Sequence, residues 1–457
     1  MVNASLKKVF IKNFKSLHDC EIDIGKMNVV VGANASGKSN LVEAFRLLKK
    51  IYVEKDPFPF LEWWGYDNVV WQRKEELPIT IGLHFDIEGY DVYFETNFTG
   101  VGRKFQILRE VLDIRGYLKF MKEGDLLTIG HNPDFIERVI KNLPKYETSL
   151  GDKTKLKKNK SGLMKEKKYS VDLEQKLLEY GFGILSASSV FTDKKAAKEF
   201  ILSNFTLSEM GIGKSDEKVI ILCPAIFYEE EFEDGSFWLP DPIINIAVHS
   251  ILEFIGKLSI LYPLNIRSMK NPQPFRREET IKEDGTNIAS VYHTIYLKEG
   301  KIPEQIYNIF TLVFPKIDVR PHITDDGRVM LKFFEDGLEL LPPNTSDGFY
   351  KILTLLTAIY LKSPLLIIDE IENSLHPETL ELILDTIKAS DIQAIITTHS
   401  PVVVDMTEPD NMILVEKEHG ESRFKRIKDP EKIRGFLKEK GIKFSVGWLY
   451  GELSHIE

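Results

Sequence analysis

The segment of residues 29–45, VVVGANASGKSNLVEAF, places a glycine-rich turn between an apolar run and an amphipathic helical pattern. Residues 32–39 match the pattern GxxxxGK[ST] at each fixed position. Glycines at both ends of such a turn let the backbone N–H groups point inward at phosphate oxygens, and the N-terminus of the following helix favours an anion. The segment therefore predicts a site for a nucleotide phosphate between a buried strand and a helix.

The residue types inside this turn suggest separate roles. Lys38 is expected to reach the β- and γ-phosphates of a nucleotide, and Ser39 is expected to ligate Mg²⁺. The other residues of the turn that we expect to contact the nucleotide are Gly32, Asn34, Gly37 and Asn40.

Two acidic residues end a second apolar run, LLIIDE, at residues 365–370. In an open α/β sheet, ligands bind at the carboxyl ends of the strands. Asp369 is therefore expected to hold Mg²⁺, usually through water, and Glu370 to orient or deprotonate the attacking water. A solvated acidic end of a buried strand is the alternative interpretation of this pair.

Two further motifs accompany these acids. His399 follows the next apolar run, IQAIITTH, where it could contact the γ-phosphate. The segment NTSDG precedes an apolar helical pattern, and Ser346 could simply cap that helix. Alternatively, the residues Ser346, Asp347 and Gly348 form a signature motif that meets a γ-phosphate held by another subunit.

Composition limits the class of protein. The formal net charge of -9 argues against a chain coated with basic charge, although a local basic patch could still bind nucleic acid. Only Cys20 and Cys223 are present, far apart, which excludes a cysteine zinc cluster and fits a reduced, cytoplasmic chain. The apolar runs are shorter than the roughly 20 residues of a membrane helix, and the N-terminus lacks a signal-peptide pattern, so no membrane partner is expected.

The hydrophobic periodicity predicts the arrangement of elements. Strands are expected within residues 7–32, a hairpin over residues 78–98 with its turn at Glu88 and Gly89, a helix over residues 243–261, and βαβ alternation from about residue 301. We interpret the lysine-rich residues 153–168 as a mobile loop that could contact phosphates.

These patterns predict an α/β fold with a P-loop NTPase head, and the family resemblance given below implies the ATP-binding-cassette type. The fold should have an antiparallel N-terminal β lobe, a mixed or parallel core sheet and a mostly helical insertion. The expected divisions are an N-terminal ATPase lobe at 1–100, the insertion at 101–280 and a C-terminal ATPase lobe at 281–457.

The order GANASGKSN, NTSDGFYKIL, LLIIDEIENSLHPE and IITTHSP resembles the ATP-binding-cassette ATPases of the RecF/SMC/OLD type. That group includes predicted AAA-type ATPases of prokaryotic defence systems. The resemblance covers about the first 55 and the last 175 residues. Heptads long enough for coiled-coil arms are absent, and the 58 residues after His399 are too few for an appended Toprim nuclease domain, so we expect neither.

The resemblance implies a mechanism. ATP binding would join two heads into a dimer or higher oligomer, with Ser346, Asp347 and Gly348 of one copy against the nucleotide of the other. Hydrolysis to ADP and phosphate would release them. Lys15, in NFKS, occupies the place of a basic residue that helps hold the nucleotide. The glutamine of the Q-loop is not identified, with Gln72 and Gln273 as candidates.

The expected function is a sensor or regulatory ATPase, antiviral or DNA-maintaining, that works with a separate effector such as a nuclease. Two alternatives stay open. One is a RecF-like clamp that itself binds DNA during repair. The other is a scaffold that binds ATP and hydrolyses it negligibly.

Overall fold

The computed structural model describes residues 4–116, 118–123, 126–131, 165–170, 213–215, 218–220, 227–232, 235–240, 242–261, 263–373 and 375–450. The chain forms two compact units. Unit 1 comprises Met1–Asp19 and Leu47–Gly256, and unit 2 comprises Cys20–Arg46 and Lys257–Glu457. This division differs from three consecutive segments, because it groups the phosphate loop with the C-terminal residues.

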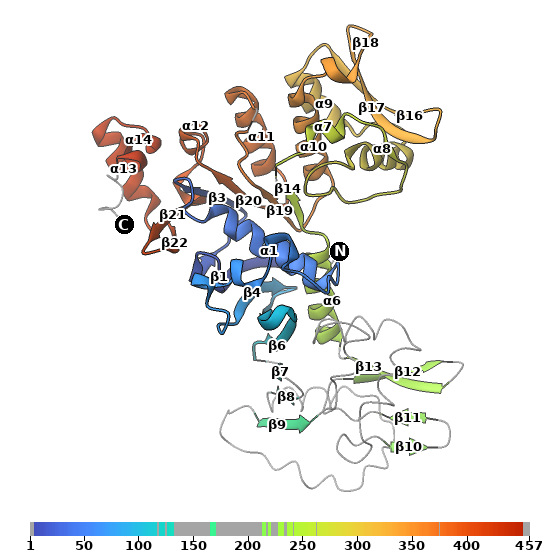
Figure 1. The fold of residues 1–457 in the computed structure, drawn as a ribbon, viewed down its shortest axis with the longest axis vertical. Coiled ribbons are helices and arrows are strands. Elements are labelled where there is room, and N and C mark those ends of the chain that lie inside the picture. Colours follow the sequence, from blue (N-terminus) through green and yellow to red (C-terminus); the bar gives the residue numbers. More distant parts are fainter. Residues whose placement is uncertain are drawn as a thin grey trace. The chain divides into compact units, whose positions relative to one another are not determined.

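Unit 1 is built on an antiparallel sheet with the strand order β2-β1-β4-β5-β6-β7-β8-β9 (Figure 1). The predicted hairpin is β4–β5, in which Ile87 lies opposite Tyr90. The two turn residues have positive φ, 51° at Glu88 and 84° at Gly89, as a tight turn between twisted strands requires. The strands are β1 Ala4–Phe14, β2 Leu17–Asp23 (which continues into unit 2), β4 Ile79–Ile87, β5 Tyr90–Thr99, β6 Gln106–Ile114, β7 Leu118–Glu123, β8 Leu126–His131 and β9 Lys165–Ser170.

The segment 101–280 differs from the mostly helical insertion that we expected. Where it is described, strands predominate, because β6 to β9 extend the sheet by antiparallel pairing with neighbours. Short strands of this kind leave only a weak periodic signal. Most of the lysine-rich segment 153–168 lies outside the described residues. The remaining elements of unit 1 are β10 Gly213–Ser215, β11 Lys218–Ile220, β12 Phe227–Phe232, β13 Gly235–Pro240, α6 Pro242–Gly256 and four 3₁₀ turns, Leu61–Trp63, Tyr66–Asn68, Trp71–Arg73 and Val101–Arg103.

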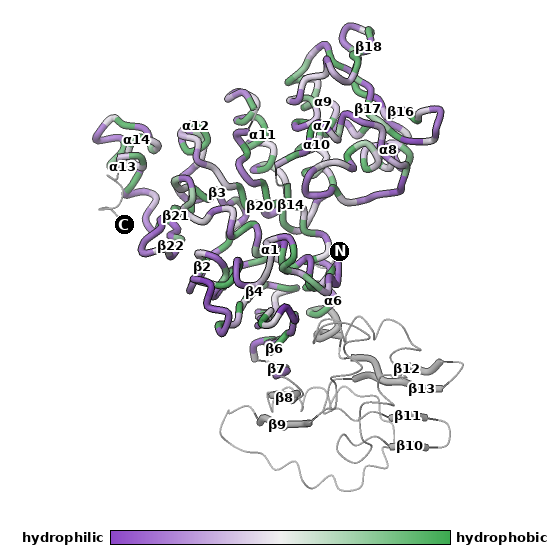
Figure 2. The backbone as a smooth tube through the Cα atoms, in the orientation of Figure 1, coloured by the Kyte–Doolittle hydropathy of each residue, from purple (hydrophilic) through white to green (hydrophobic). Residues whose placement is uncertain are grey.

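Unit 2 contains a six-stranded sheet with the order β14-β19-β20-β3-β21-β22. All neighbours are parallel except the C-terminal hairpin β21–β22. Strands β3 and β19 are buried at every position, which explains the apolar runs at residues 29–31 and 365–368. Figure 2 shows the hydrophobic stretches of the tube at these central strands. The strands are β14 Ser259–Leu261, β19 Leu365–Ile368, β20 Gln393–Thr398, β3 Met27–Gly32, β21 Met412–Glu418 and β22 Glu421–Arg426.

Helices pack against this sheet and bury its apolar face. Side chains of α10 and α11 share one core with Leu366, Ile368 and Ile396 of the strands. In Figure 1, α10, α11 and α12 follow one another along the sheet. The helices are α1 Lys38–Tyr52 (which continues into unit 1), α7 Ile266–Met269, α8 Ile288–Glu299, α9 Glu304–Val313, α10 Asp347–Tyr360, α11 Pro377–Ala389, α12 Pro401–Asp405, α13 Pro430–Lys440 and α14 Phe444–Leu449.

A small antiparallel sheet and two 3₁₀ turns complete unit 2. Strand β17 pairs with three partners, and its pairing with β16 is antiparallel. These elements are β15 Gln273–Pro274, β16 Ile317–Ile323, β17 Arg328–Glu335, β18 Leu338–Leu340 and the 3₁₀ turns Pro342–Asn344 and Pro409–Asn411.

The helix predicted over residues 243–261 is too long. Helix α6 ends at Gly256, and Ser259–Leu261 instead form the edge strand β14. Parallel pairing with β19 satisfies the backbone of this segment, as when Asp369 N donates to Leu261 O over 2.9 Å. Unpaired backbone N–H and C=O groups at the edge of a buried strand are costly in free energy. Pairing the backbone of these three residues with β19 is therefore more favourable than extending the helix through them.

Leu366→Ala should destabilise unit 2. Leu366 is fully buried in β19, so truncation leaves a cavity and costs about 2–5 kcal/mol. The matched control is Leu338→Ala, at a side chain that is 76% exposed. Thermal or urea unfolding should show a lower midpoint for the first variant only. Equal midpoints for the two variants would contradict the placement of β19 in the core.

Candidate nucleotide-binding and catalytic site

The phosphate loop leaves the end of β3 through a tightly curled backbone. Gly37 has φ 110° and Ala35 has φ 61°, conformations that L side chains rarely adopt. A Cβ at Gly32 would lie 2.5 Å from Ser36 Oγ and 2.6 Å from Val415 O. The loop therefore needs glycine at its first position for space and at its sixth for backbone freedom.

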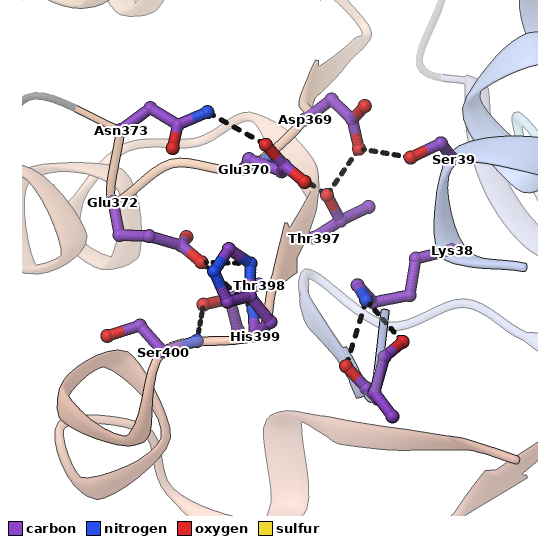
Figure 3. A network of polar contacts seen from close by, with 12 residues as sticks. Lys38, Ser39, Asp369, Glu370, Glu372, Asn373, Thr397, Thr398, His399 and Ser400 are labelled. Atoms are coloured by element: carbon purple, nitrogen blue, oxygen red, sulfur yellow. Dashed lines mark hydrogen bonds and ion pairs between the residues drawn. The ribbon is translucent and has the colours of Figure 1, made fainter. Parts of the chain in front are cut away.

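Lys38 points back into this loop (Figure 3). Its ammonium donates to Gly32 O over 2.8 Å and to Ala33 O over 3.0 Å, and the residue is only 6% exposed. Burial lowers the pKa of Lys38, while the carboxylates of the site, Glu370 foremost, act in the opposite direction. A cation is thus held at the loop by backbone carbonyls and nearby acids.

Asp369 receives hydrogen bonds from two hydroxyl groups. Ser39 Oγ donates to Asp369 Oδ1 over 3.3 Å, and Thr397 Oγ1 donates to the same oxygen. Burial raises the pKa of Asp369, and the bonds from Thr397 and Ser39 lower it. Ser39 and Asp369 were named from the sequence as metal ligands. Thr397 was not singled out, although it lies in the TTHS motif beside His399.

Glu370 is held in an unusual conformation. Its φ of 51° is left-handed, and backbone strain of this kind gathers at functional sites. Thr397 Oγ1 accepts from Glu370 N over 2.9 Å, and Asn373 Nδ2 donates to Glu370 Oε2 over 2.8 Å. The hydroxyl of Thr397 therefore orients both acids. It donates to the carboxylate of Asp369 and accepts from the backbone N–H of Glu370.

His399 contacts an acid that the sequence reasoning did not name. Glu372 Oε1 accepts from His399 N over 2.9 Å and lies 3.1 Å from His399 Nδ1. The histidine side chain is 42% exposed. The imidazole is therefore oriented by Glu372 at the same sheet edge as Asp369 and Glu370 (Figure 3).

The segment Ser346–Gly348 begins helix α10. Ser346 Oγ accepts from Gly348 N over 3.2 Å, so the capping role foreseen from the sequence is present. Lys270 Nζ donates to Thr345 O over 2.7 Å and lies 2.8 Å from Asp347 Oδ1. Ser346 and Asp347 are exposed.

The remaining residues that were predicted to contact the nucleotide are not gathered at one place in unit 2. Lys15 belongs to unit 1, where its N–H donates to Val69 O over 2.7 Å and its ammonium lies 5.5 Å from the centroid of Trp63. Asn34 is exposed on the loop, and Asn40 N donates to Gly37 O over 3.1 Å. Gln273 Nε2 donates to the backbone carbonyls of residues 268 and 271, and Gln72 lies in unit 1. The roles of these residues stay predictions.

The residues present fit a nucleotide phosphate with Mg²⁺. Ser36 Oγ is buried and has no hydrogen-bond partner in the described part of the chain, so it can donate to a phosphate oxygen. A serine hydroxyl beside an aspartate carboxylate is the hard oxygen set that Mg²⁺ prefers. No cluster of three or more His, Cys, Asp or Glu side chains suited to a metal occurs among the described residues.

Comparison with known families agrees with this geometry. The model of the family described as "AAA ATPase domain" matches residues 5–404. The chain belongs to this family. The match confirms the predicted AAA-type ATPase domain, and the sheet order and the phosphate loop confirm the α/β P-loop fold.

Individual relatives are more distant. An uncharacterized protein of Methanocaldococcus jannaschii, MJECL44, is 31% identical over 136 residues, which cover 26% of this chain and 39% of that relative. The chain thus spans well under half of that relative's length.

None of the helices in the described residues is long and apolar enough to cross a membrane.

Solved structures of SMC heads also align. An SMC head bound to the C-terminal winged-helix domain of ScpA is 14% identical, covers 94% of this chain and 99% of its own, and has a TM-score of 0.47. An SMC head from Pyrococcus furiosus with ScpA is 15% identical, with coverages of 95% and 99% and a TM-score of 0.45. One from Thermotoga maritima is 13% identical, with coverages of 93% and 100% and a TM-score of 0.35.

Thr397→Val should impair any chemistry at this site while the fold persists. Valine keeps the shape of threonine but removes the hydroxyl that holds Asp369 and Glu370. Losing a buried hydrogen bond of this kind costs about 1–3 kcal/mol, so ATP turnover should fall about tenfold or more. In the control Thr386→Val, the lost hydroxyl bonds only Leu382 O within α11. Equal turnover in both variants would remove Thr397 from the site.

Proposed function

We propose that this chain is a Mg²⁺-dependent ATPase whose copies pair when ATP binds. The observation that carries the proposal is the meeting of Lys38, Ser39 and Asp369 beside Glu370 within one compact unit. Membership of the AAA ATPase domain family supports ATP as the nucleotide.

Each side chain has a role in hydrolysis to ADP and phosphate. Lys38 would move its ammonium from the backbone carbonyls to the β- and γ-phosphates, since charge-assisted bonds to phosphate are stronger. Glu370 would orient the attacking water and accept its proton, with the carboxylate aimed by Asn373. His399, oriented by Glu372, would contact the γ-phosphate. Ser39 and Asp369 would hold Mg²⁺, which neutralises phosphate charge when bound.

Pairing is supported by the exposed N-terminus of α10. Ser346 caps this helix of 14 residues, and its first backbone N–H groups and its dipole favour an anion. Lys270 holds Asp347 at the same end, so the segment is ordered in a single copy. The γ-phosphate bound by a second copy is the anion that we assign to Ser346, Asp347 and Gly348, giving a dimer or higher oligomer.

The biological role that we propose is a sensor or regulatory subunit, cytoplasmic, in a prokaryotic defence or DNA-maintenance system. Its separate effector would be a nuclease. The motif order supports this role. Turnover measured with and without duplex DNA separates it from the RecF-like clamp, because strong stimulation by plain duplex would favour the clamp. An adjacent gene for a Toprim or HNH nuclease would support the effector.

Glu370→Gln should abolish turnover and keep ATP binding. The amide cannot accept a proton from water, so kcat should fall about 100-fold or more. Because the nucleotide would then persist, pairs formed with ATP should accumulate on size-exclusion chromatography. The matched control is Glu381→Gln at an exposed position of α11. If wild type shows no turnover and Glu370→Gln changes nothing, the chain is an ATP-binding scaffold and not an enzyme.

Lys38→Ala should abolish both hydrolysis and association that depends on ATP. The lost ammonium is the buried cation of the phosphate loop, and without it the γ-phosphate would not be held for the second copy. Nucleotide binding by calorimetry and pairing by light scattering both test this. Lys417→Ala, at an exposed lysine of β21, is the control. A Lys38→Ala variant that still pairs on adding ATP would show that the bound nucleotide does not hold the two copies together.

A further inference from the structure

Lys351 links helix α10 to the turn that follows β19. It lies one helical turn beyond Gly348, on the same helix that Ser346 caps. Its side chain is partly buried, and Lys351 Nζ donates to the backbone carbonyl of Asn373. Neither the phosphate loop nor the acidic pair includes this lysine.

The carbonyl that Lys351 holds belongs to the residue that aims Glu370. Asn373 Nδ2 donates to Glu370 Oε2 over 2.8 Å, and Asn373 N donates to Glu370 O over 3.1 Å. The turn of residues 370–373 is therefore closed by its own bonds, and the ammonium of Lys351 links it to α10. A displacement of that contact would act on a glutamate whose φ of 51° is already strained.

The charges around this turn also depend on the lysine. Burial lowers the pKa of Lys351 to about 8. The negative charge of Glu372 and, less strongly, that of Glu370 act in the opposite direction and favour the charged form of the lysine. Glu372 Oε2 is buried and has no hydrogen-bond partner within the described residues. A cation beside two acids in one turn offsets their mutual repulsion, and its removal would leave that repulsion less compensated.

We propose that Lys351 is a positioning residue that couples the signature end of α10 to Glu370 of the same subunit. The inference rests on the proposed function, in which Ser346–Gly348 meet the nucleotide of a second copy. Pairing then moves or fixes the start of α10, and Lys351 passes that change to Asn373 and so to the glutamate. Each subunit hydrolyses its own ATP fully only when its signature segment is engaged.

Steady-state ATPase assays near neutral pH test the coupling with Lys351→Met, which keeps the length of the side chain and removes the charge. We expect kcat to fall about tenfold or more, KM to change less than about twofold, and pairing with ATP to persist. Lys351→Arg should recover most of kcat because it restores the cation. Lys388→Met, at an exposed lysine of α11, is the matched control.

A double-mutant cycle with Asn373→Ala gives a second readout. Asn373→Ala keeps the carbonyl but removes the bond to Glu370, so the coupling predicts that Lys351→Met adds little to its loss of kcat. Losses that multiply, or a Lys351→Met variant with wild-type kcat, would overturn the inference. A parallel fall in kcat, ATP binding and melting temperature would show a structural lysine instead and would equally overturn it.

Glu370→Gln, measured in the same assay, separates this failure from a failure of the proposed function. If Glu370→Gln loses turnover and Lys351→Met does not, only the coupling is wrong. If Glu370→Gln loses nothing, the proposed ATPase itself is wrong and the coupling fails with it.

Discussion

The parallel pairing of β20 between β3 and β19 is the constraint on which the rest of the site depends. In this register Val29 lies opposite Ile396, and Ile367 lies opposite Ile395. Because all three strands run the same way, their carboxyl ends meet at one edge, and the groups that follow them meet there too. A shift of register in this sheet would separate the phosphate loop from the acids.

At that edge, buried charges are balanced against one another. Burial lowers the pKa of Lys38, and the nearby carboxylates oppose this shift. Burial raises the pKa of Asp369, the hydrogen bonds from Thr397 and Ser39 and the charge of Lys38 oppose this shift, and the charge of Glu370 adds to it. Such groups are costly to bury unless each is paired and hydrogen-bonded. Thr397 links the two acids, because its hydroxyl donates to Asp369 and accepts from the backbone N–H of Glu370.

How much was predictable varies with the kind of signal. The phosphate loop, the hairpin at Glu88 and Gly89, and the strand that ends at the acids depend on local patterns, and the structure has them where they were predicted. The strand β14 was mispredicted because its partner β19 lies far away in the sequence. In the described part of 101–280, β6 and β7 pair as sequence neighbours, and their period-two alternation was not recognised. Thr397 and Lys351 were missed because threonine and lysine carry no signal of their contacts.

The sequence by itself determined the chemistry available: a turn that must cradle an anion, a lysine and a serine beside it, and acids at the end of a buried strand. Local sterics and hydrophobic periodicity suffice for such features. Only the tertiary structure decided which groups meet, with Ser39 against Asp369 across 330 positions and Lys351 against the carbonyl of Asn373. Hydrogen bonds between distant segments depend on packing and register, which no local pattern encodes.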